Sequence, residues 1–208
     1  MSRGYAAVAF TDHVRDAQVT YGSRAAQARL EHKFGQPEVA EPTDNLGEGE
    51  RAFLAQQDGF FLATVSDTGW PYVQFRGGPP GFVHTPDNRT VAWADFRGNR
   101  QYITVGNLGH DDRVALIFLD YAQQVRLKIY GRARVTDVHK VGHSDLSLPD
   151  YPAKVERDVH VQVTAFDWNC DQHITPRYSV VELDEQLAPL RQRLTQLELE
   201  NAQLRAGT

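Results

Sequence analysis

The sequence predicts a mainly β fold of the barrel or sandwich type, with helices at its periphery. Strand-like runs follow one another at short spacing through residues 60–183, and tight turns separate them. Residues 158–166 alternate between apolar and polar side chains, which is typical of a strand with one buried face. Only one convincing helix, residues 99–108, interrupts the strands. Together these observations favour a sheet that curls around its own core.

The strands are expected to pair as hairpins. The first hairpin joins Phe60–Val65 to Tyr72–Arg76 through residues 67–69, whose Asp-Thr-Gly sequence suits a tight turn. Gly131 interrupts a long strand and predicts a bulge or a close approach of two backbones. Two further hairpins are expected, namely Gly81–His84 with Thr90–Ala94, and Arg113–Tyr121 with Val125–Val135.

Composition divides the chain into three parts. Residues 1–49 form a polar arm, with a helix expected over residues 23–34 and a loop rich in Pro and Glu after it. Residues 50–183 form the β domain, opened by a short helix over residues 50–57. Residues 184–208 form an amphipathic C-terminal helix.

Leucines of the C-terminal segment recur at alternating steps of four and three, and Asn201 continues their stripe. An Asn at one a position of a heptad fixes the register of two-stranded parallel coiled coils. Pro189 is best placed in a first helical turn, so the helix is expected to begin near Ala188. Two interpretations follow: a dimer zipper, or a helix docked on its own domain. The leucines of the stripe are Leu183, Leu187, Leu190, Leu194, Leu197 and Leu204.

The bulk composition is that of an ordinary globular protein. The 208 residues are 41% hydrophobic and 24% charged, and the formal net charge of -5 argues against sequence-independent binding of nucleic acid. A single cysteine, Cys170, excludes an internal disulfide and fits a reducing compartment. We find no secretory signal and no apolar stretch long enough to span a membrane, so a cytoplasmic location is expected.

Two arginine-glycine corners follow strand-like runs. One is Arg76-Gly77-Gly78, and the other runs from Arg97 through Gly98, Asn99 and Arg100 to Gln101. Glycine allows the backbone to approach a ligand, and arginine offers donors suited to phosphate oxygens. Asn99 is expected to cap the helix that follows, whose free amides would add to the arginines in holding an anion. The alternative is that these arginines are exposed and pair with Asp95, Asp111 or Asp112.

Several motifs in order resemble the FMN-binding split-barrel proteins related to pyridoxamine 5′-phosphate oxidase. The resemblance covers roughly residues 50–180. Ordered motifs at family-like spacing are more specific than any one of them alone. The motifs are Phe61–Val65, Gly69–Val73, Arg76–Pro79, Ala94–Tyr102, Gly106–Leu108, Asp112–Leu116 and Trp168–Tyr178.

The resemblance implies a homodimer of split β-barrels, with one FMN in each of two clefts at the subunit interface. Arg76 and Arg100 match the family's phosphate-binding basic positions, and Arg126 or Gln124 would reach the flavin from a neighbouring strand. The segment that begins at Trp168 would close over the ring, from the same chain or from the partner. The expected cofactor-binding residues are Arg76, Gly77, Trp93, Ala94, Asp95, Arg97, Asn99, Arg100, Gln101, Arg126, Trp168 and Asn169.

The sequence also departs from the true pyridoxamine-phosphate oxidases. Their substrate-gripping Arg-x-His triplet has no counterpart after Phe166, and their Tyr/Arg/Ser set for the substrate phosphate has none in residues 139–151. We therefore expect an FMN-dependent oxidoreductase of another substrate, with no acid or base residue assignable. The alternative is a flavin- or haem-binding storage or sensing protein without turnover, and the deazaflavin F420 is an alternative cofactor.

Metal-ligand and nucleophile patterns are weak in this sequence. His139 and His143 lie four residues apart, and Cys170 and His173 three apart, which are spacings that a zinc site can use. The first pair flanks an expected loop and the second lies within a family-like motif, so no metal is expected. Cys170 has no evident orienting group that would make it a nucleophile.

Overall fold

In the computed structural model, residues 2, 4–34, 44–169 and 172–206 are described. The chain divides into two compact units. One unit spans Met1–Asp120 and Val125–Asp171, and the other spans Tyr121–Gln124 and Gln172–Thr208. The candidate site lies in the first unit.

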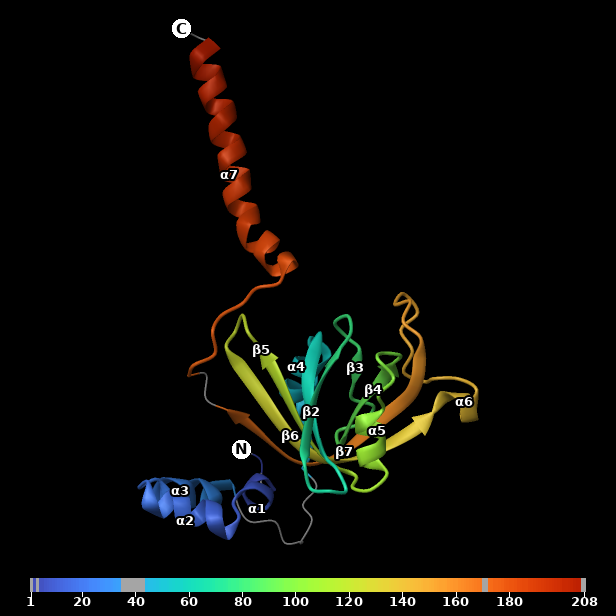
Figure 1. The fold of residues 1–208 in the computed structure, drawn as a ribbon. Helices are drawn as coiled ribbons and strands as arrows, with labels where there is room; N and C mark the ends of the chain where they lie inside the picture. The colour runs from blue at the N-terminus through green and yellow to red at the C-terminus, as the bar shows by residue number, and fades with distance from the viewer. Residues whose placement is uncertain (1, 3, 35–43, 170–171, 207–208) are drawn as a thin grey trace. The chain divides into compact units, whose positions relative to one another are not determined.

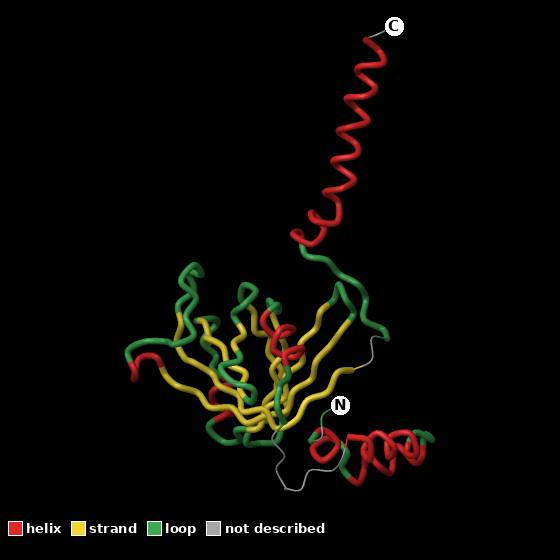
Figure 2. Tube along the Cα trace, turned by 180° about the vertical axis from the view of Figure 1, so that it is seen from behind, coloured by secondary structure: helices red, strands yellow, loops and turns green. Residues whose placement is uncertain are grey.

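Seven antiparallel strands form one sheet in the order β2-β1-β5-β6-β7-β4-β3 (Figure 1). The strands bend along their length, so that the sheet curls into a half-barrel (Figure 2). The predicted mainly β, split-barrel fold is therefore confirmed. The strands are β1 (Gly59–Val65), β2 (Pro71–Gly77), β3 (Val83–His84), β4 (Thr90–Phe96), β5 (Arg113–Asp120), β6 (Val125–Asp137) and β7 (Val155–Asn169).

The three predicted hairpins are present as β1–β2, β3–β4 and β5–β6. In the first, Val65 pairs with Pro71 and Gly59 with Gly77. Gly69 adopts a φ of 84° in the turn, a left-handed conformation that costs glycine little. The turn chemistry of the sequence was thus a sound guide to local pairing.

Strand β7 joins the two halves of the sheet, because it pairs with β6 along one edge and with β4 along the other. The β6–β7 register shifts between Tyr130 and Gly131, which confirms the expected bulge. A Cβ atom at Gly131 would lie 2.5 Å from the carbonyl oxygen of Gln162, so only glycine lets the two backbones approach this closely.

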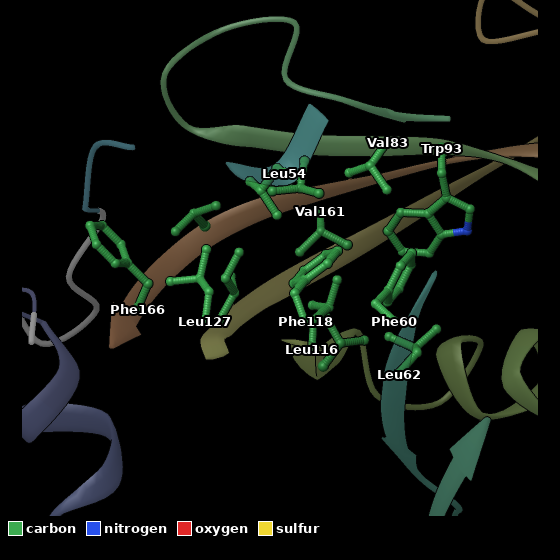
Figure 3. Close-up of a cluster of buried hydrophobic side chains, with 14 of the residues drawn as sticks. Leu54, Phe60, Leu62, Val83, Trp93, Leu116, Phe118, Leu127, Val161 and Phe166 are labelled. Carbon is green, nitrogen blue, oxygen red and sulfur yellow. The ribbon is translucent and has the colours of Figure 1, made fainter. Parts of the chain in front are cut away.

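The inner face of the half-barrel holds the main hydrophobic core (Figure 3), a row of side chains from Phe166 to Trp93. The ring of Phe60 meets Trp93 edge-on at 4.9 Å and lies 4.7 Å from Phe118, between ring centroids. The predicted apolar face of β7 is buried, and its three valines belong to this core. Its residues are Val159, Val161, Val163 and Ala165.

The helices differ from the sequence prediction in three places. α1, α2 and α6 were not predicted. α5 begins at Ile103 rather than at residue 99, and Tyr102, not Asn99, is its N-cap residue. α7 begins at Val180 rather than near Ala188 and contains Pro189 in its interior. The helices are α1 (Tyr5–Ala9), α2 (Asp12–Thr20), α3 (Arg24–Phe34), α4 (Glu48–Ala55), α5 (Ile103–Leu108), α6 (Val138–Val141) and α7 (Val180–Ala206).

Across the described ranges, no helix has both the length and the apolar character needed to cross a membrane.

Candidate anion-binding cleft

An open cleft lies where the end of β2, the end of β4, the start of β7 and the N-terminal turn of α5 meet. Strand β2 contributes alternate residues to it, because side chains of a strand point to opposite faces in turn, whereas β7 contributes the adjacent Glu156 and Arg157. The loop between β4 and α5 closes one side. The lining residues are Tyr72, Gln74, Arg76, Asp95, Phe96, Gly98, Asn99, Arg100, Gln101, Tyr102, Ile103, Thr104, Val105, Glu156 and Arg157.

A network of charged side chains forms the floor of the cleft. Asp95, which is 3% exposed, accepts a hydrogen bond from Nε of Arg157 at 2.8 Å. Nη1 of Arg76 lies 2.9 Å from Asp95 Oδ1, an ion pair whose angles are outside those of a hydrogen bond. Nη2 of Arg157 also donates to Oε2 of buried Glu156 at 2.9 Å. The two carboxylates therefore hold Arg157 firmly and Arg76 less so.

Arg157 remains cationic on this floor. Burial alone would lower the pKa of Arg157, but the hydrogen bonds and charges of Asp95 and Glu156 outweigh burial and raise that pKa above its ordinary value. The side chain of Arg76 is 17% exposed, and its Nε is buried without a hydrogen-bond partner among the described residues. A buried donor without a partner is costly, so Arg76 is prepared to donate to an added acceptor.

The loop that closes the cleft is held in an uncommon conformation. Arg100 and Tyr102 have φ values of 63° and 54°, in the left-handed region that side-chain-bearing residues rarely adopt. Each such residue costs of order 1–3 kcal/mol, and such residues cluster at binding sites. The side-chain oxygen of Asn99 accepts a hydrogen bond from the backbone of Gln101 at 3.1 Å. The guanidinium of Arg157 lies 5.0 Å from the ring centroid of Tyr102 and braces the loop from below.

Five of the predicted cofactor-binding residues line this cleft together, and two more lie at its border. At the border, Nε of Arg97 is 3.2 Å from Oε1 of Glu156, so Arg97 is tied to the charged floor. Gly77 ends β2, and a Cβ there would lie 2.9 Å from the ring of Phe75. The five lining residues are Arg76, Asp95, Asn99, Arg100 and Gln101.

Trp93 and Ala94 precede Asp95 on β4, but their side chains point into the protein. Trp93 is 1% exposed and belongs to the main core, with its Nε1 buried and unpartnered within the described structure. Ala94 is buried in a smaller cluster with Ala92 and Leu146. In this chain their role is to position the end of β4 beside the cleft.

The remaining three predicted residues lie where the end of β7 pairs with the start of β6. Trp168 donates from Nε1 to Oε1 of Glu50 at 2.7 Å and meets Phe53 edge-on, which fastens α4 to the sheet. Arg126 pairs with Asn169 in the β6–β7 ladder; the side chain of Asn169 is outside the described residues, as is Cys170. From Arg157 to Trp168 the strand spans about 36 Å of extended chain. Arg126 and Trp168 do not line the cleft of their own chain.

Sequence reasoning missed several residues that line the cleft. Tyr72 and Gln74 alternate with Arg76 on one face of β2, so strand periodicity could have found them. Arg157 faces Asp95 across the β4–β7 ladder, a pairing that no local pattern predicts. Thr104, which donates to Gln74 at 3.0 Å, ties α5 to the same strand.

His139 and His143 do not build a metal site in the described structure, and the pair of Cys170 with His173 lies partly outside the described residues. Nε2 of His143 lies 3.2 Å from an Asp145 carboxylate on the surface, and His139 is at a helix start. Among the described residues, no group of three or more His, Cys, Asp or Glu side chains converges in a way that could hold a metal ion.

The curled antiparallel sheet thus carries an arginine-lined cleft, which is a candidate site for an anion. Residues 46–145 match the family model described as Pyridoxamine 5′-phosphate oxidase, and this segment includes β2, β4 and the closing loop. This match confirms the resemblance to the pyridoxamine 5′-phosphate oxidase-related family that the sequence motifs indicated.

Three solved structures to which the chain is similar carry different descriptions. A putative pyridoxamine 5′-phosphate oxidase from Lactobacillus delbrueckii is 18% identical, with a TM-score of 0.42 over 59% of this chain and 93% of that one. An F420 reductase is 20% identical, with a TM-score of 0.41 over 59% and 98%. The FAD-binding protein from Mycobacterium smegmatis is 16% identical, with a TM-score of 0.41 over 61% and 96%. No curated protein matches the chain.

Proposed function

We propose that this chain is an FMN-binding flavoprotein that acts as an oxidoreductase in the cytoplasm. One observation supports the proposal above the others. Arg76, with its unpartnered Nε, and Arg100, on a strained loop, line one cleft within the segment that matches the family. Paired arginine donors of this kind suit the oxygens of a phosphate monoester.

The charges of the cleft fit a phosphate. Its lining has three arginines and two carboxylates, which leaves it with a net positive charge. Asp95 and Glu156 both form ion pairs with Arg157, so their negative charges are compensated and do not by themselves repel an incoming anion. Arg100 has no ion pair within the described structure and is exposed toward the cleft. An anion would be held between Arg76 and Arg100.

The residues of this chain would anchor and orient the cofactor. Bound FMN would supply hydride or electron transfer through its isoalloxazine ring. Arg76 and Arg100 would hold the phosphate, with Asn99 and Gln101 fixing the loop around it. The missing Arg-x-His triplet after Phe166 argues that the substrate is not pyridoxamine phosphate.

We place the second set of cofactor residues on a partner subunit. Arg126 at the start of β6, and Trp168 and Asn169 at the end of β7, do not line the cleft of their own chain, but a homodimer could bring the partner's copies to it. The outer face of β2 favours such a dimer, because Val73 and Phe75 are 59% and 57% exposed there. A second copy of the chain would cover these side chains.

The first test compares FMN with riboflavin, which lacks the phosphate. We expect FMN to bind more tightly than riboflavin, and Arg100→Ala to weaken FMN binding about tenfold without changing riboflavin binding. Arg134→Ala is the matched control, because Arg134 is an exposed arginine of β6 outside the cleft. Equal binding of FMN by Arg100→Ala and Arg134→Ala would refute the phosphate site, and F420 and haem would then be tested as ligands.

A second test separates an enzyme from a flavin-holding protein. Anaerobic addition of NADH or NADPH should bleach the bound flavin, and readmission of oxygen or an acceptor should restore its absorbance in repeated cycles. A flavin that stays oxidised with both donors would instead indicate storage or sensing.

A further inference from the structure

The C-terminal helix α7 presents a continuous apolar stripe. No described residue of this helix is buried, and the stripe follows a heptad repeat in which Asn201 is the single polar member. An amphipathic helix of this length gains stability chiefly by covering its apolar face. The a positions are Val180, Leu187, Leu194 and Asn201, and the d positions are Leu183, Leu190, Leu197 and Leu204.

The helix is longer than its sequence indicated. It runs for 27 residues, because the segment before Pro189 is helical as well. Pro189 falls at a c position, on the side away from the stripe, so the proline ring does not interrupt the seam. Five a and d positions follow the proline without a break, from Leu190 to Leu204.

We propose that α7 forms a parallel, in-register, two-stranded coiled coil with α7 of a second copy of this chain. The charged residues that flank the seam have opposite signs at the positions where the two helices would face each other. In a parallel dimer a g residue faces the e residue five positions later on the partner helix. Arg193 then faces the partner's Glu198, and Glu200 faces the partner's Arg205. Both pairs are attractive.

Asn201 selects the parallel orientation. In a parallel pair it lies opposite the partner's Asn201, so the two amides hydrogen-bond to each other. In an antiparallel pair an a residue faces a d residue, and every d position of α7 is leucine. The buried amide would then be unpartnered, which is costly. Leu194, Leu197 and Asn201 lie next to one another on this face of the helix.

The proposed coil adds an assembly element to the barrel, separate from the flavin cleft. A parallel coil has the same two-fold symmetry as a dimer of barrels, so one pair of chains can satisfy both. The inference does not depend on FMN binding.

The test is disulfide crosslinking of the full-length chain in a Cys170→Ser background. Leu204→Cys places a thiol at a d position, where an in-register parallel pair brings the two Cα atoms to about 6 Å, within disulfide range. Leu199→Cys is the matched control, because Leu199 is an exposed leucine of the same helix at an f position, outside the stripe. We expect the disulfide dimer to form roughly tenfold or more faster from Leu204→Cys than from Leu199→Cys.

A second substitution links crosslinking to the seam. Leu197→Glu should abolish the fast crosslinking of Leu204→Cys, whereas Leu199→Glu should leave it unchanged. Equal crosslinking of the two cysteine variants, or insensitivity to Leu197→Glu, would overturn the proposal and indicate a docked or antiparallel helix. Flavin content measured on the same samples keeps the two proposals apart, since a chain that crosslinks but holds no FMN would refute only the cofactor site.

Discussion

Asp95→Asn should weaken the fold and strengthen anion binding at the same time. Asp95 is a buried carboxylate shared by two arginines, with Arg157 Nε at 2.8 Å and Arg76 Nη1 at 2.9 Å. The amide is nearly the same size, so the substitution removes a charge without opening a cavity. Two measurable quantities then change in opposite directions.

The stability loss follows from leaving buried charge unpaired. Breaking a buried ion pair costs about 3–5 kcal/mol, and we expect the lower end because Arg157 keeps Glu156 as a partner. The gain in affinity follows from removing a negative charge next to the phosphate. At about 6 Å and an effective dielectric constant near 40, one charge pair is worth roughly 1.4 kcal/mol, which is about tenfold in Kd.

Urea unfolding measures the first quantity, and titration of FMN fluorescence measures the second. Asp158→Asn is the control. Asp158 is a buried carboxylate like Asp95, but it lies on β7 and accepts hydrogen bonds from Ser144 and the Asp145 backbone outside the cleft. It should lower stability without tightening FMN binding, and riboflavin affinity should stay constant in both variants. Folded Asp95→Asn protein that binds FMN no more tightly than the parent would refute the assignment of Arg76 to the phosphate.

Three further predictions concern the scaffold. Gly131→Ala should lower the free energy of unfolding by about 1–3 kcal/mol, because its Cβ meets backbone at 2.5 Å, whereas Gly106→Ala has open space and should be neutral or stabilising in thermal melts. Burial lowers the pKa of His84, so the unfolded chain takes up that proton first, and stability should fall as the pH drops below about 6.5. His84→Gln should flatten this pH dependence in urea titrations, and an unchanged slope would contradict it. Trp168→Phe should cost about 1.5 kcal/mol in urea unfolding through the lost hydrogen bond to Glu50, and a cost near zero would show that this bond does not hold α4.

Local patterns predicted the strands well because each depended on neighbours in sequence. The alternation in residues 158–166 and the Asp-Thr-Gly turn are properties of short segments, and both appear as expected. The same local reasoning identified Arg76 and Arg100 as candidate binding residues, since each belongs to an arginine-glycine corner that follows its own strand.

The failures share a non-local cause. The loop before α5 is not the first turn of a helix, because Arg97 N–H donates to the carbonyl of Lys154 and Arg157 packs on Tyr102. Those partners lie more than fifty residues away in the chain. The sequence did not predict Arg157 for the same reason, since it is the β4–β7 pairing that brings this residue to Asp95.

Strand β2 lies at the edge of the sheet, where among the described residues it pairs with β1 alone. One face of β2 contributes Arg76 to the cleft, while the other exposes Val73 and Phe75. A shift of one residue would exchange these faces. The turn that fixes the register therefore limits which changes in chain length the sequence tolerates. An insertion or deletion of odd length that shifted the register would move Arg76 to the outer face and bring Val73 and Phe75 to the cleft. A shift of even length would keep the same set of side chains on the cleft face.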